Sequence, residues 1–478
     1  MHGNGPLSPR RRFPPPARPL SSPAWWVPSP SFPQGSSMIS RRSCLAGLAG
    51  LALPAVSRTG WAQTAPAPAA APAGLPMNGR LTHLAYSDQG GHPDGVQVMV
   101  SRKTLYVGHM FSNGFTVMDV ADPTKPTPIQ FVAAPANTRT HHLQTNGDLM
   151  LLACGADIPT IGKYNPGLSY YQQSFGGSMA GKADFAAGVK IYDTSKPAAP
   201  REIGFLNIPG IGVNRLWYAG GRYAYISAHM DGFTDHILVI ADINDPTKPE
   251  IVGKWWIPGM WKEGGETPSW SGKRVALHHM IVAGDTGYAA WRDGGFTILD
   301  LTDKTKPKLV SHVNTAPPYP GGTHTPLPLP GRKLAVIADE SSSLNCAKGL
   351  SYTWIYDVRA PQNPVSISSL PTPKEENFCR TGENFGPHNL HENRPETFQS
   401  EELIFATYHN AGLRVFDIRD AYAPREVARF VPPPPKRILD PRPGNALAPQ
   451  TCDVNVQTDG IIYLSDWNAG LHVLRYEG

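Results

Sequence analysis

The sequence predicts an all-β protein, and specifically a seven-bladed β-propeller closed by an N-terminal strand that completes the C-terminal blade. The first observation is a repeated unit: a glycine, a short apolar strand ending in aspartate, and a proline-bracketed turn, with not every element kept in every copy. Its copies begin at Gly114, Gly188, Ile237, Gly295, Ser351, Gly412 and Gly470. Their spacing, about 50 to 75 residues, suits one four-stranded blade with variable loops. Val, Ile, Leu, Tyr and Phe dominate the strands, and no amphipathic helix of useful length appears.

Each unit is expected to form four short strands. In the second unit, residues 142–145 form the first strand and residues 148–155 the second, joined by the tight turn Asn146-Gly147. Residues 188–193 and 202–208 supply the third and fourth strands. The aspartate that ends each third strand is expected to bond the backbone of the following proline turn, not to act in catalysis.

The two ends of the repeat region are expected to meet. The last unit stops after its third strand, within residues 470–478, and lacks a fourth. Residues 81–88 precede the first unit and can supply the missing strand, which leaves no open edge in the ring. The sequence therefore predicts one propeller domain over residues 80–478.

The first 79 residues are predicted to lie outside the propeller. Residues 1–37 are rich in Pro, Arg and Ser; they are either a non-native extension before a true start at Met38, or a disordered leader. Residues 38–62 place Arg41-Arg42 before an apolar run, which is typical of a twin-arginine signal peptide, and residues 63–79 form a Pro/Ala linker. We therefore expect a periplasmic or secreted protein, exported by the twin-arginine translocon, with no membrane span in the mature chain.

Charge argues against a nucleic-acid partner. The whole chain has 43 basic and 38 acidic residues, a net charge of +5. All seven charged residues in positions 1–62 are arginines, so the mature chain has 36 basic and 38 acidic residues, a net charge of −2. A chain with this balance carries no basic footprint for nucleic acid.

Histidines recur at two places in the unit. One set enters the first strand, which lines the central channel of a propeller: His141, His142, His278, His279, His324, His388 and His391. The other set lies at the corner between the second and third strands: His109, His229 and His409, with Glu340 at this place in its own unit. Both places lie on one face of a propeller, the top face.

This convergence predicts a divalent transition-metal site (Fe, Cu, Ni or Zn) with His142, His279, His324 and His388 as ligands, because neutral imidazole binds these metals. Glu340, His409, His229, His109, His391, His141 and His278 are predicted to be outer partners or substrate contacts. The alternative is a duplicated strand-capping histidine that only forms hydrogen bonds. Asn214-Arg215 and Val454-Asn455 stand at the equivalent place in two units, so the repeat itself does not require histidine.

Two further features fall on the same face. The long loop of residues 155–187 is either a lid over a substrate or decoration. Cys346 and Cys379 lie in top loops of adjacent units and are predicted to form a disulfide, whereas Cys154 and Cys452 are expected to remain thiols. The sequence contains no phosphate-binding glycine loop, GxSxG, CxxC or HExxH motif, so nucleotide-dependent and serine-hydrolase functions have no support.

The units resemble the LVIVD-repeat family of exported bacterial β-propeller proteins. The resemblance rests on Ile237-Leu-Val-Ile-Ala-Asp, Phe115-Thr-Val-Met-Asp, and the stretches at residues 386–395 and 407–418, and it covers residues 80–478. More distantly, the chain resembles the selenium-binding-protein/methanethiol-oxidase propellers, which are also seven-bladed and rich in histidine. The family resemblance implies the propeller fold and no particular activity.

Two functional hypotheses follow. The first is a metal-binding propeller that acts as an oxidoreductase on a small organic or sulfur compound. The second is a non-catalytic scaffold whose top face docks a protein, peptide or glycan. Metal content distinguishes the two hypotheses.

Overall fold

The computed structural model describes residues 75–157, 184–341, 343–441 and 445–477. All of these residues belong to one compact unit, Pro68–Gly478. The described residues contain one short 3₁₀ helix, η2 (Phe378–Arg380), and otherwise form strands and loops. No helix in this part of the chain is long and apolar enough to cross a membrane.

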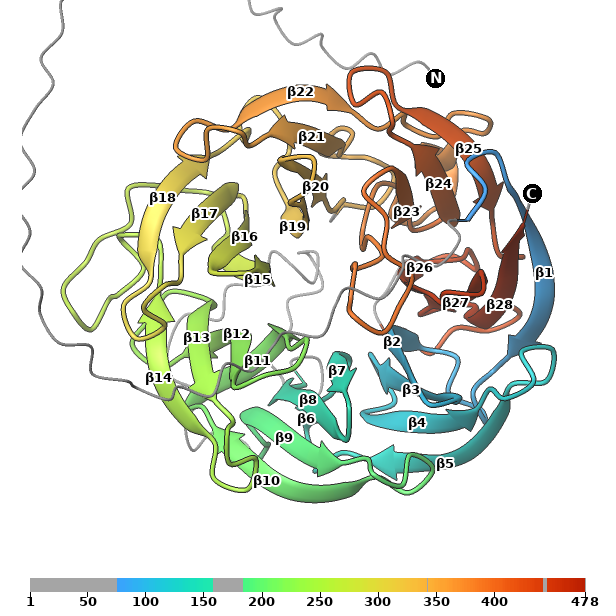
Figure 1. The fold of residues 1–478 in the computed structure, drawn as a ribbon, viewed down its shortest axis with the longest axis horizontal. Coiled ribbons are helices and arrows are strands. Elements are labelled where there is room, and N and C mark those ends of the chain that lie inside the picture. Colours follow the sequence, from blue (N-terminus) through green and yellow to red (C-terminus); the bar gives the residue numbers. More distant parts are fainter. Residues whose placement is uncertain (1–74, 158–183, 342, 442–444, 478) are drawn as a thin grey trace, which may run out of the picture. The chain divides into compact units, whose positions relative to one another are not determined.

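The strands form curled antiparallel sheets around a common centre (Figure 1). One sheet contains β2 (Gly95–Ser101), β3 (Thr104–His109), β4 (Gly114–Asp119) and β5 (Thr127–Ala133). The next run contains β7 (Leu143–Asn146), β8 (Leu149–Ala156), β9 (Gly188–Asp193) and β10 (Arg201–Asn207), with β6 (Thr138–Arg139) against β8. It is joined through β8 to β11 (Gly210–Trp217), β12 (Tyr223–Met230), β13 (Ile237–Asp242) and β14 (Glu250–Trp255).

The remaining sheets continue the ring. A second joined pair of runs contains β15 (Val275–Ala283), β16 (Thr286–Arg292), β17 (Phe296–Asp300) and β18 (Lys308–Val313), then β19 (Thr323–Leu329), β20 (Leu334–Asp339), β21 (Thr353–Asp357) and β22 (Val365–Ser369). A three-stranded sheet follows: β23 (Leu403–Thr407), β24 (Leu413–Asp417) and β25 (Arg425–Phe430). The last sheet combines β26 (Thr451–Val456), β27 (Ile461–Asp466) and β28 (Gly470–Glu477) with β1 (Arg80–Ser87).

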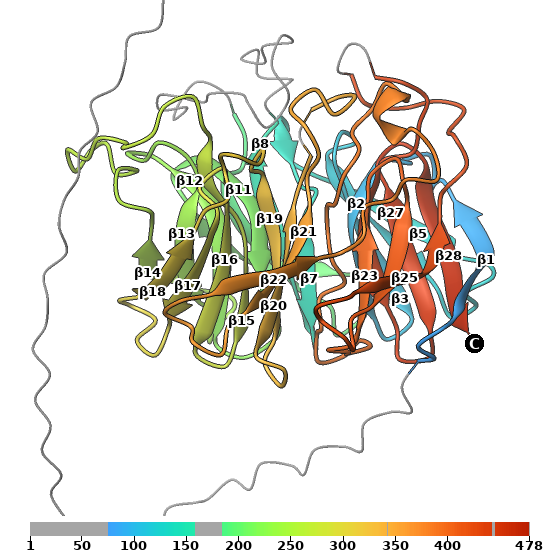
Figure 2. The ribbon, with the colours of Figure 1, turned by 90° about the horizontal axis from the view of Figure 1, so that it is seen from above.

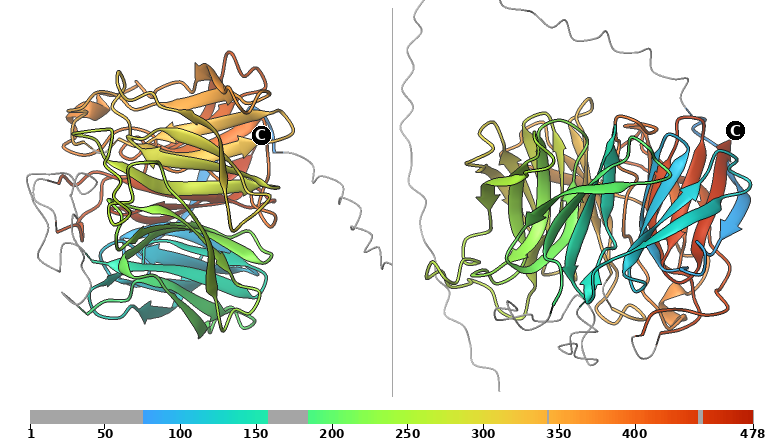
Figure 3. Two further views of the ribbon diagram at one scale, coloured as in Figure 1. Left: turned by 90° about the vertical axis from the view of Figure 1, so that its left-hand side faces the viewer. Right: turned by 90° about the horizontal axis from the view of Figure 1, so that it is seen from below.

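This arrangement is that of a β-propeller, and the all-β prediction is confirmed. Figure 1 places β7, β11, β15 and β19 near the centre and β10, β14, β18 and β22 at the rim. Viewed edge-on, the sheets stand side by side across the thickness of the ring (Figures 2 and 3). The first strand of the described chain, β1, pairs antiparallel with the last, β28, from Arg80 opposite Glu477 to Ser87 opposite Leu471.

The repeated aspartates cap the turns after the third strands. The Oδ1 atom of each one accepts a hydrogen bond of 2.8–3.0 Å from the backbone N–H two residues later. The six aspartates are Asp119, Asp193, Asp242, Asp300, Asp357 and Asp417. The sequence-based role of this residue is therefore confirmed, and it accounts for the aspartate without any catalytic function.

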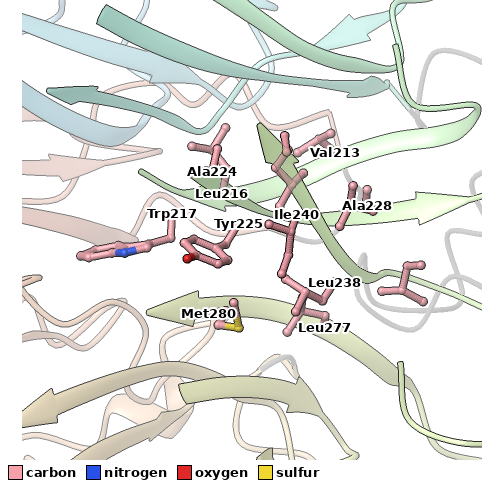
Figure 4. Close-up of a cluster of buried hydrophobic side chains, with 14 of the residues drawn as sticks. Val213, Leu216, Trp217, Ala224, Tyr225, Ala228, Leu238, Ile240, Leu277 and Met280 are labelled. Carbon is pink, nitrogen blue, oxygen red and sulfur yellow. The ribbon is translucent and has the colours of Figure 1, made fainter. Parts of the chain in front are cut away.

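Apolar side chains pack between neighbouring sheets. In the largest cluster, Val213 and Leu216 of β11 and Ile240 of β13 pack with Leu277 and Met280 of β15 (Figure 4). Both faces of β12 and β13 are buried because each sheet has a neighbour on either side. Near the top loops, the sulfur atoms of Cys346 and Cys379 are bonded, whereas Cys154 and Cys452 are buried free thiols.

The orientation of β28 in the closing sheet predicts different effects on stability for substitutions at two adjacent residues. Leu474 is fully buried, whereas Arg475 is exposed. Leu474→Ala should lower the free energy of unfolding by about 2–5 kcal/mol because it leaves a cavity. Arg475→Ala should change it by less than about 0.5 kcal/mol. Urea unfolding of both variants tests this, and equal effects would show that β28 is oriented differently.

Candidate metal centre

Six histidines form a continuous row of rings near the centre of the propeller. The ring centroids of the neighbours His141–His142, His142–His278, His278–His324, His324–His388 and His388–His409 lie 4.2, 6.4, 3.6, 4.3 and 4.8 Å apart. All six side chains are buried. Burial lowers the pKa of His388 to about 3 and holds that of His324 well below its usual range. These imidazoles are therefore neutral at pH 7, the form that binds metals.

Glu340 brings a carboxylate into this row. It follows β20, and its Oε2 atom accepts a hydrogen bond from the guanidinium of Arg292 at the end of β16. The Nε2 atom of His324 lies 3.6 Å from Oε2, and the Nε2 atom of His388 lies 3.7 Å from Oε1. Both separations are too long for hydrogen bonds. Glu340 Oε1 and His324 Nε2 are buried and form no hydrogen bond. We name His324, Glu340 and His388 the axial cluster.

The tautomer of His388 is fixed by its other nitrogen. Its Nδ1 atom lies 2.6 Å from the carbonyl oxygen of Cys452, so Nδ1 carries the proton and donates it. In the neutral ring Nε2 is then unprotonated. Its lone pair lies 3.7 Å from a carboxylate oxygen that forms no hydrogen bond.

His324 is held in the same way. Its Nδ1 atom lies 2.8 Å from the hydroxyl oxygen of Thr325. That hydroxyl has two acceptors at 3.3 Å, the carbonyl oxygen of His388 and Oδ1 of Asn389, so its own proton goes to one of them. In that arrangement the hydroxyl accepts the proton of His324 Nδ1, and the Nε2 atom of His324 is left unprotonated.

The axial cluster thus brings together two imidazole lone pairs and one carboxylate with no proton between them. Its ligand atoms all lie within 4.8 Å of one another. Two ligands on one tetrahedral metal ion with bonds of about 2.0–2.1 Å lie roughly 3.3 Å apart, close to the spacing here. The Arg292 guanidinium lies on Oε2 of Glu340 and offsets its charge. Two nitrogens and one oxygen suit Zn, Fe, Cu or Ni.

The corners between second and third strands hold the cluster in place. Arg292 and His409 each stand three residues before the glycine that directly precedes the next strand, and both have positive φ, +51° and +42°. In both corners a backbone N–H bonds across the turn, from Trp291 to Gly295 and from Tyr408 to Gly412. The Nε2 atom of His409 lies 3.8 Å from Glu340 Oε1, so it borders the axial cluster. Left-handed backbone at a non-glycine residue is often found where function constrains geometry.

Two of the four predicted ligands lie elsewhere. His279 directs Nε2 to Oε1 of Glu392 at 2.8 Å. His142 places Nδ1 3.3 Å from Oε1 of Gln97. The structure brings His324 and His388 together, and it adds Glu340, which the sequence had suggested as an outer partner.

The predicted outer histidines fall into three groups. Both ring nitrogens of His109 are engaged, by Asp94 at 3.2 Å and Thr116 at 2.7 Å. His391 is engaged by the carbonyl oxygen of Phe398 and the N–H of Val456. His141 and His278 belong to the central row, and the ring of His278 stacks on that of His324. His229 lies in a separate group with Asp235 and His236. Of the predicted lid, residues 158–183 lie outside the described residues.

A buried network around Glu392 is linked to the axial cluster through Asn389 and Thr325. Glu392 Oε1 accepts hydrogen bonds from His279 and from Arg215, both at 2.8 Å, and Oε2 accepts one from Gln144 at 3.0 Å. Burial opposes ionisation of Glu392, but the hydrogen bond from His279 and the charges of Arg215 and Arg394 hold its pKa below the usual range. The network therefore contains a charged carboxylate among buried arginines.

Three residues of the site were not predicted from the sequence: Arg292, Arg215 and Glu392. Arg292 could have been predicted by aligning the units, because Trp291-Arg292 stands before Gly295 as Tyr408-His409 stands before Gly412. Arg215 was seen only as a departure from histidine in its unit. Glu392 lies in the segment 386–395, which has no counterpart in the other units and therefore no positional signal.

The chain contains LVIVD repeats. A model of the LVIVD repeat matches residues 94–132, 216–255 and 279–315, which correspond to β2–β5, the end of β11 to β14, and β15–β18. No curated protein matches the sequence.

Several solved structures are similar to the chain in outline. The periplasmic gluconolactonase PpgL of Pseudomonas aeruginosa is 12% identical over 78% of this chain and 99% of that one, with a TM-score of 0.49. A chain of the mitotic checkpoint complex is 10% identical over 88% and 100%, with a TM-score of 0.49. A functionally unknown protein from Desulfotomaculum acetoxidans is 11% identical over 68% and 83%, with a TM-score of 0.43. Similarities at this level say nothing about activity.

The buried imidazoles predict loss of stability in acid. Burial lowers the pKa of His279 to about 4 in the folded state, whereas an unfolded histidine has a pKa of about 6.5. Between these values the unfolded chain binds one proton more, so stability falls as the pH falls. His279→Gln keeps a donor for Glu392 and should reduce the slope of unfolding free energy against pH by up to about 1.4 kcal/mol per unit. Chelator-treated protein, unfolded in urea between pH 7.5 and 5, tests this; an unchanged slope would contradict it.

Proposed function

We propose that this protein is an exported, seven-bladed β-propeller that binds one divalent transition-metal ion through His324, His388 and Glu340. The observation that carries the proposal is the pair of unprotonated Nε2 atoms beside a buried carboxylate oxygen that forms no hydrogen bond. A buried polar atom without a partner is costly, and a metal ion satisfies all three donors at once.

Seven blades are supported by the strand runs and by residues 388–391. These residues run antiparallel to β23, since His388 N–H bonds the carbonyl of Thr407 and His391 N–H bonds that of Phe405, both at 2.9 Å. They supply an inner strand to the three-stranded sheet, which then resembles the others. Export through the twin-arginine translocon to the periplasm is supported by Arg41-Arg42 and the apolar run after them.

The charges around the cluster favour an anionic or oxygen-donor ligand at the metal. The two imidazoles are neutral, and the negative charge of Glu340 is offset by Arg292. A divalent ion would therefore keep most of its charge. Three protein ligands also leave a coordination position open, as in catalytic metal sites.

On this basis we propose that the protein is an oxidoreductase acting on a small organic or sulfur compound. The bound metal would supply redox or Lewis-acid chemistry. The protein contributes the fixed imidazole tautomers, the carboxylate held by Arg292, and a wall formed by Trp467, whose ring lies 5.7 Å from that of His388 and 5.2 Å from that of His409.

A non-catalytic binding function is the second candidate. A cavity of about 480 Å³ is lined by His83, Tyr86 and His472 on one side and by Pro433, Pro434 and Pro435 on the other, with Arg437 beside them. Its volume is within the range of small-ligand sites. If binding there is the whole function, the purified protein contains no metal.

Metal content of axial-cluster variants tests the proposal. Wild-type protein should retain a Zn²⁺ ion in the axial cluster after dialysis. The variants His324→Ala, His388→Ala and Glu340→Gln should each lower the affinity of the axial cluster for Zn²⁺ by more than about 100-fold, because each removes a ligand. His279→Gln and His142→Gln, buried histidines outside the cluster, should retain it. The assay is elemental analysis after equilibrium dialysis, with circular dichroism to confirm folding. Loss in the two control variants together with retention in His388→Ala would contradict the assignment.

A further inference from the structure

A second group of donors lies at the corner between β12 and β13. His229 is near the end of β12, and Asp235 and His236 lie just before β13. The ligand atoms of these three residues lie within 4.8 Å of one another, and the two imidazole rings are 5.6 Å apart. We name this group the corner cluster. It shares no residue with the axial cluster.

His236 is oriented by a carboxylate. Its Nδ1 atom lies 2.6 Å from Oδ1 of Asp235, so Nδ1 donates its proton to that oxygen. Asp235 is itself fixed by Arg274, whose Nε and Nη2 donate to its two oxygens at 2.8 and 3.1 Å. In the neutral ring the Nε2 atom of His236 is therefore unprotonated. This order of carboxylate, imidazole and open nitrogen is typical of metal-ligating histidines.

His229 presents the complementary nitrogen. Its Nε2 atom lies 3.3 Å from the carbonyl oxygen of Phe233, which can only accept, so Nε2 carries the proton. Its Nδ1 atom is then unprotonated, and although it is buried it forms no hydrogen bond. The hydroxyl of Thr234, in the same corner, is also buried without a hydrogen bond. Buried polar atoms in native proteins usually have a partner, and a water or an ion can serve as one here.

The corner is built rigidly. Its backbone bonds outward at three points: Asp231 N–H to the carbonyl of Pro209, Thr234 N–H to that of Met260, and Gly232 carbonyl to the N–H of Glu263. Phe233 packs edge-on against Trp256, with ring centroids 5.1 Å apart. A site held by packed elements is already formed before its ligand arrives.

We infer that the corner cluster is a second transition-metal site, in which His229 Nδ1 and His236 Nε2 are the protein ligands and Asp235 is the outer partner. Both oxygens of Asp235 are occupied by Arg274 and His236, so the carboxylate orients a ligand instead of binding the ion. Two neutral imidazoles favour copper or zinc over calcium and magnesium, which require oxygen ligands. This inference is independent of the proposed function of the axial cluster.

The test uses the chain described above with Zn²⁺ as the probe. Wild-type protein and His312→Gln, which changes an exposed histidine, should bind two equivalents. His236→Gln should bind one equivalent and keep the axial ion, and His388→Gln should bind one equivalent and keep the corner ion. A wild type that binds one equivalent, unaffected by His236→Gln, would overturn the inference. If His236→Gln loses one equivalent of Zn²⁺ and His388→Gln loses none, the corner site is supported and the axial assignment is overturned.

Anomalous diffraction from zinc-soaked wild-type crystals removes any dependence on folding of the variants. A peak between His229 and His236 is the expected result. An empty corner in a crystal whose axial cluster is occupied would overturn the inference.

Discussion

The ion pair between Glu392 and Arg215 is the interaction on which the rest of the propeller depends. Around it, hydrogen bonds join side chains from the inner part of the ring: Gln144 of β7, Arg215 of β11, His279 of β15, Thr325 of β19, Asn389, and Asp453 of β26. Asp453 also accepts a hydrogen bond from the backbone N–H of Val98 in β2. Each of these groups would be costly to bury alone. These hydrogen bonds tie the inner strands to one another around one axis.

The same constraint positions the axial cluster. Asn389 accepts a hydrogen bond from Arg215 and donates one to Asp453, which fixes the backbone beside His388. The carbonyl of Cys452 then selects the tautomer of His388, and Thr325 selects that of His324. Desolvation keeps the rings neutral, and Arg292 keeps Glu340 in reach of them. The metal-binding chemistry is thus a consequence of burial and of hydrogen bonds on the far nitrogens.

Much of the fold could be predicted from repetition, because repeated units must form repeated structures. The third strands that end in aspartate, the capping role of Asp119 and its equivalents, and the pairing of residues 81–88 with the last unit all follow from aligned units. The residues of the site were harder to predict from the sequence. His142 and His279 occupy equivalent positions, yet neither joins the axial cluster, because ring direction depends on partners such as Gln97 and Glu392 that do not repeat. Asp235 and His236 have no counterparts in the equivalent corners of the other units, so periodicity could not single them out.

X-ray absorption of zinc-loaded protein identifies the ligands of the axial ion. The His236→Gln variant, loaded with one equivalent of Zn²⁺, isolates the axial cluster. We expect two imidazole nitrogens and one carboxylate oxygen at about 2.0–2.2 Å, with solvent completing the coordination. A spectrum with four imidazoles, or with none, would contradict it.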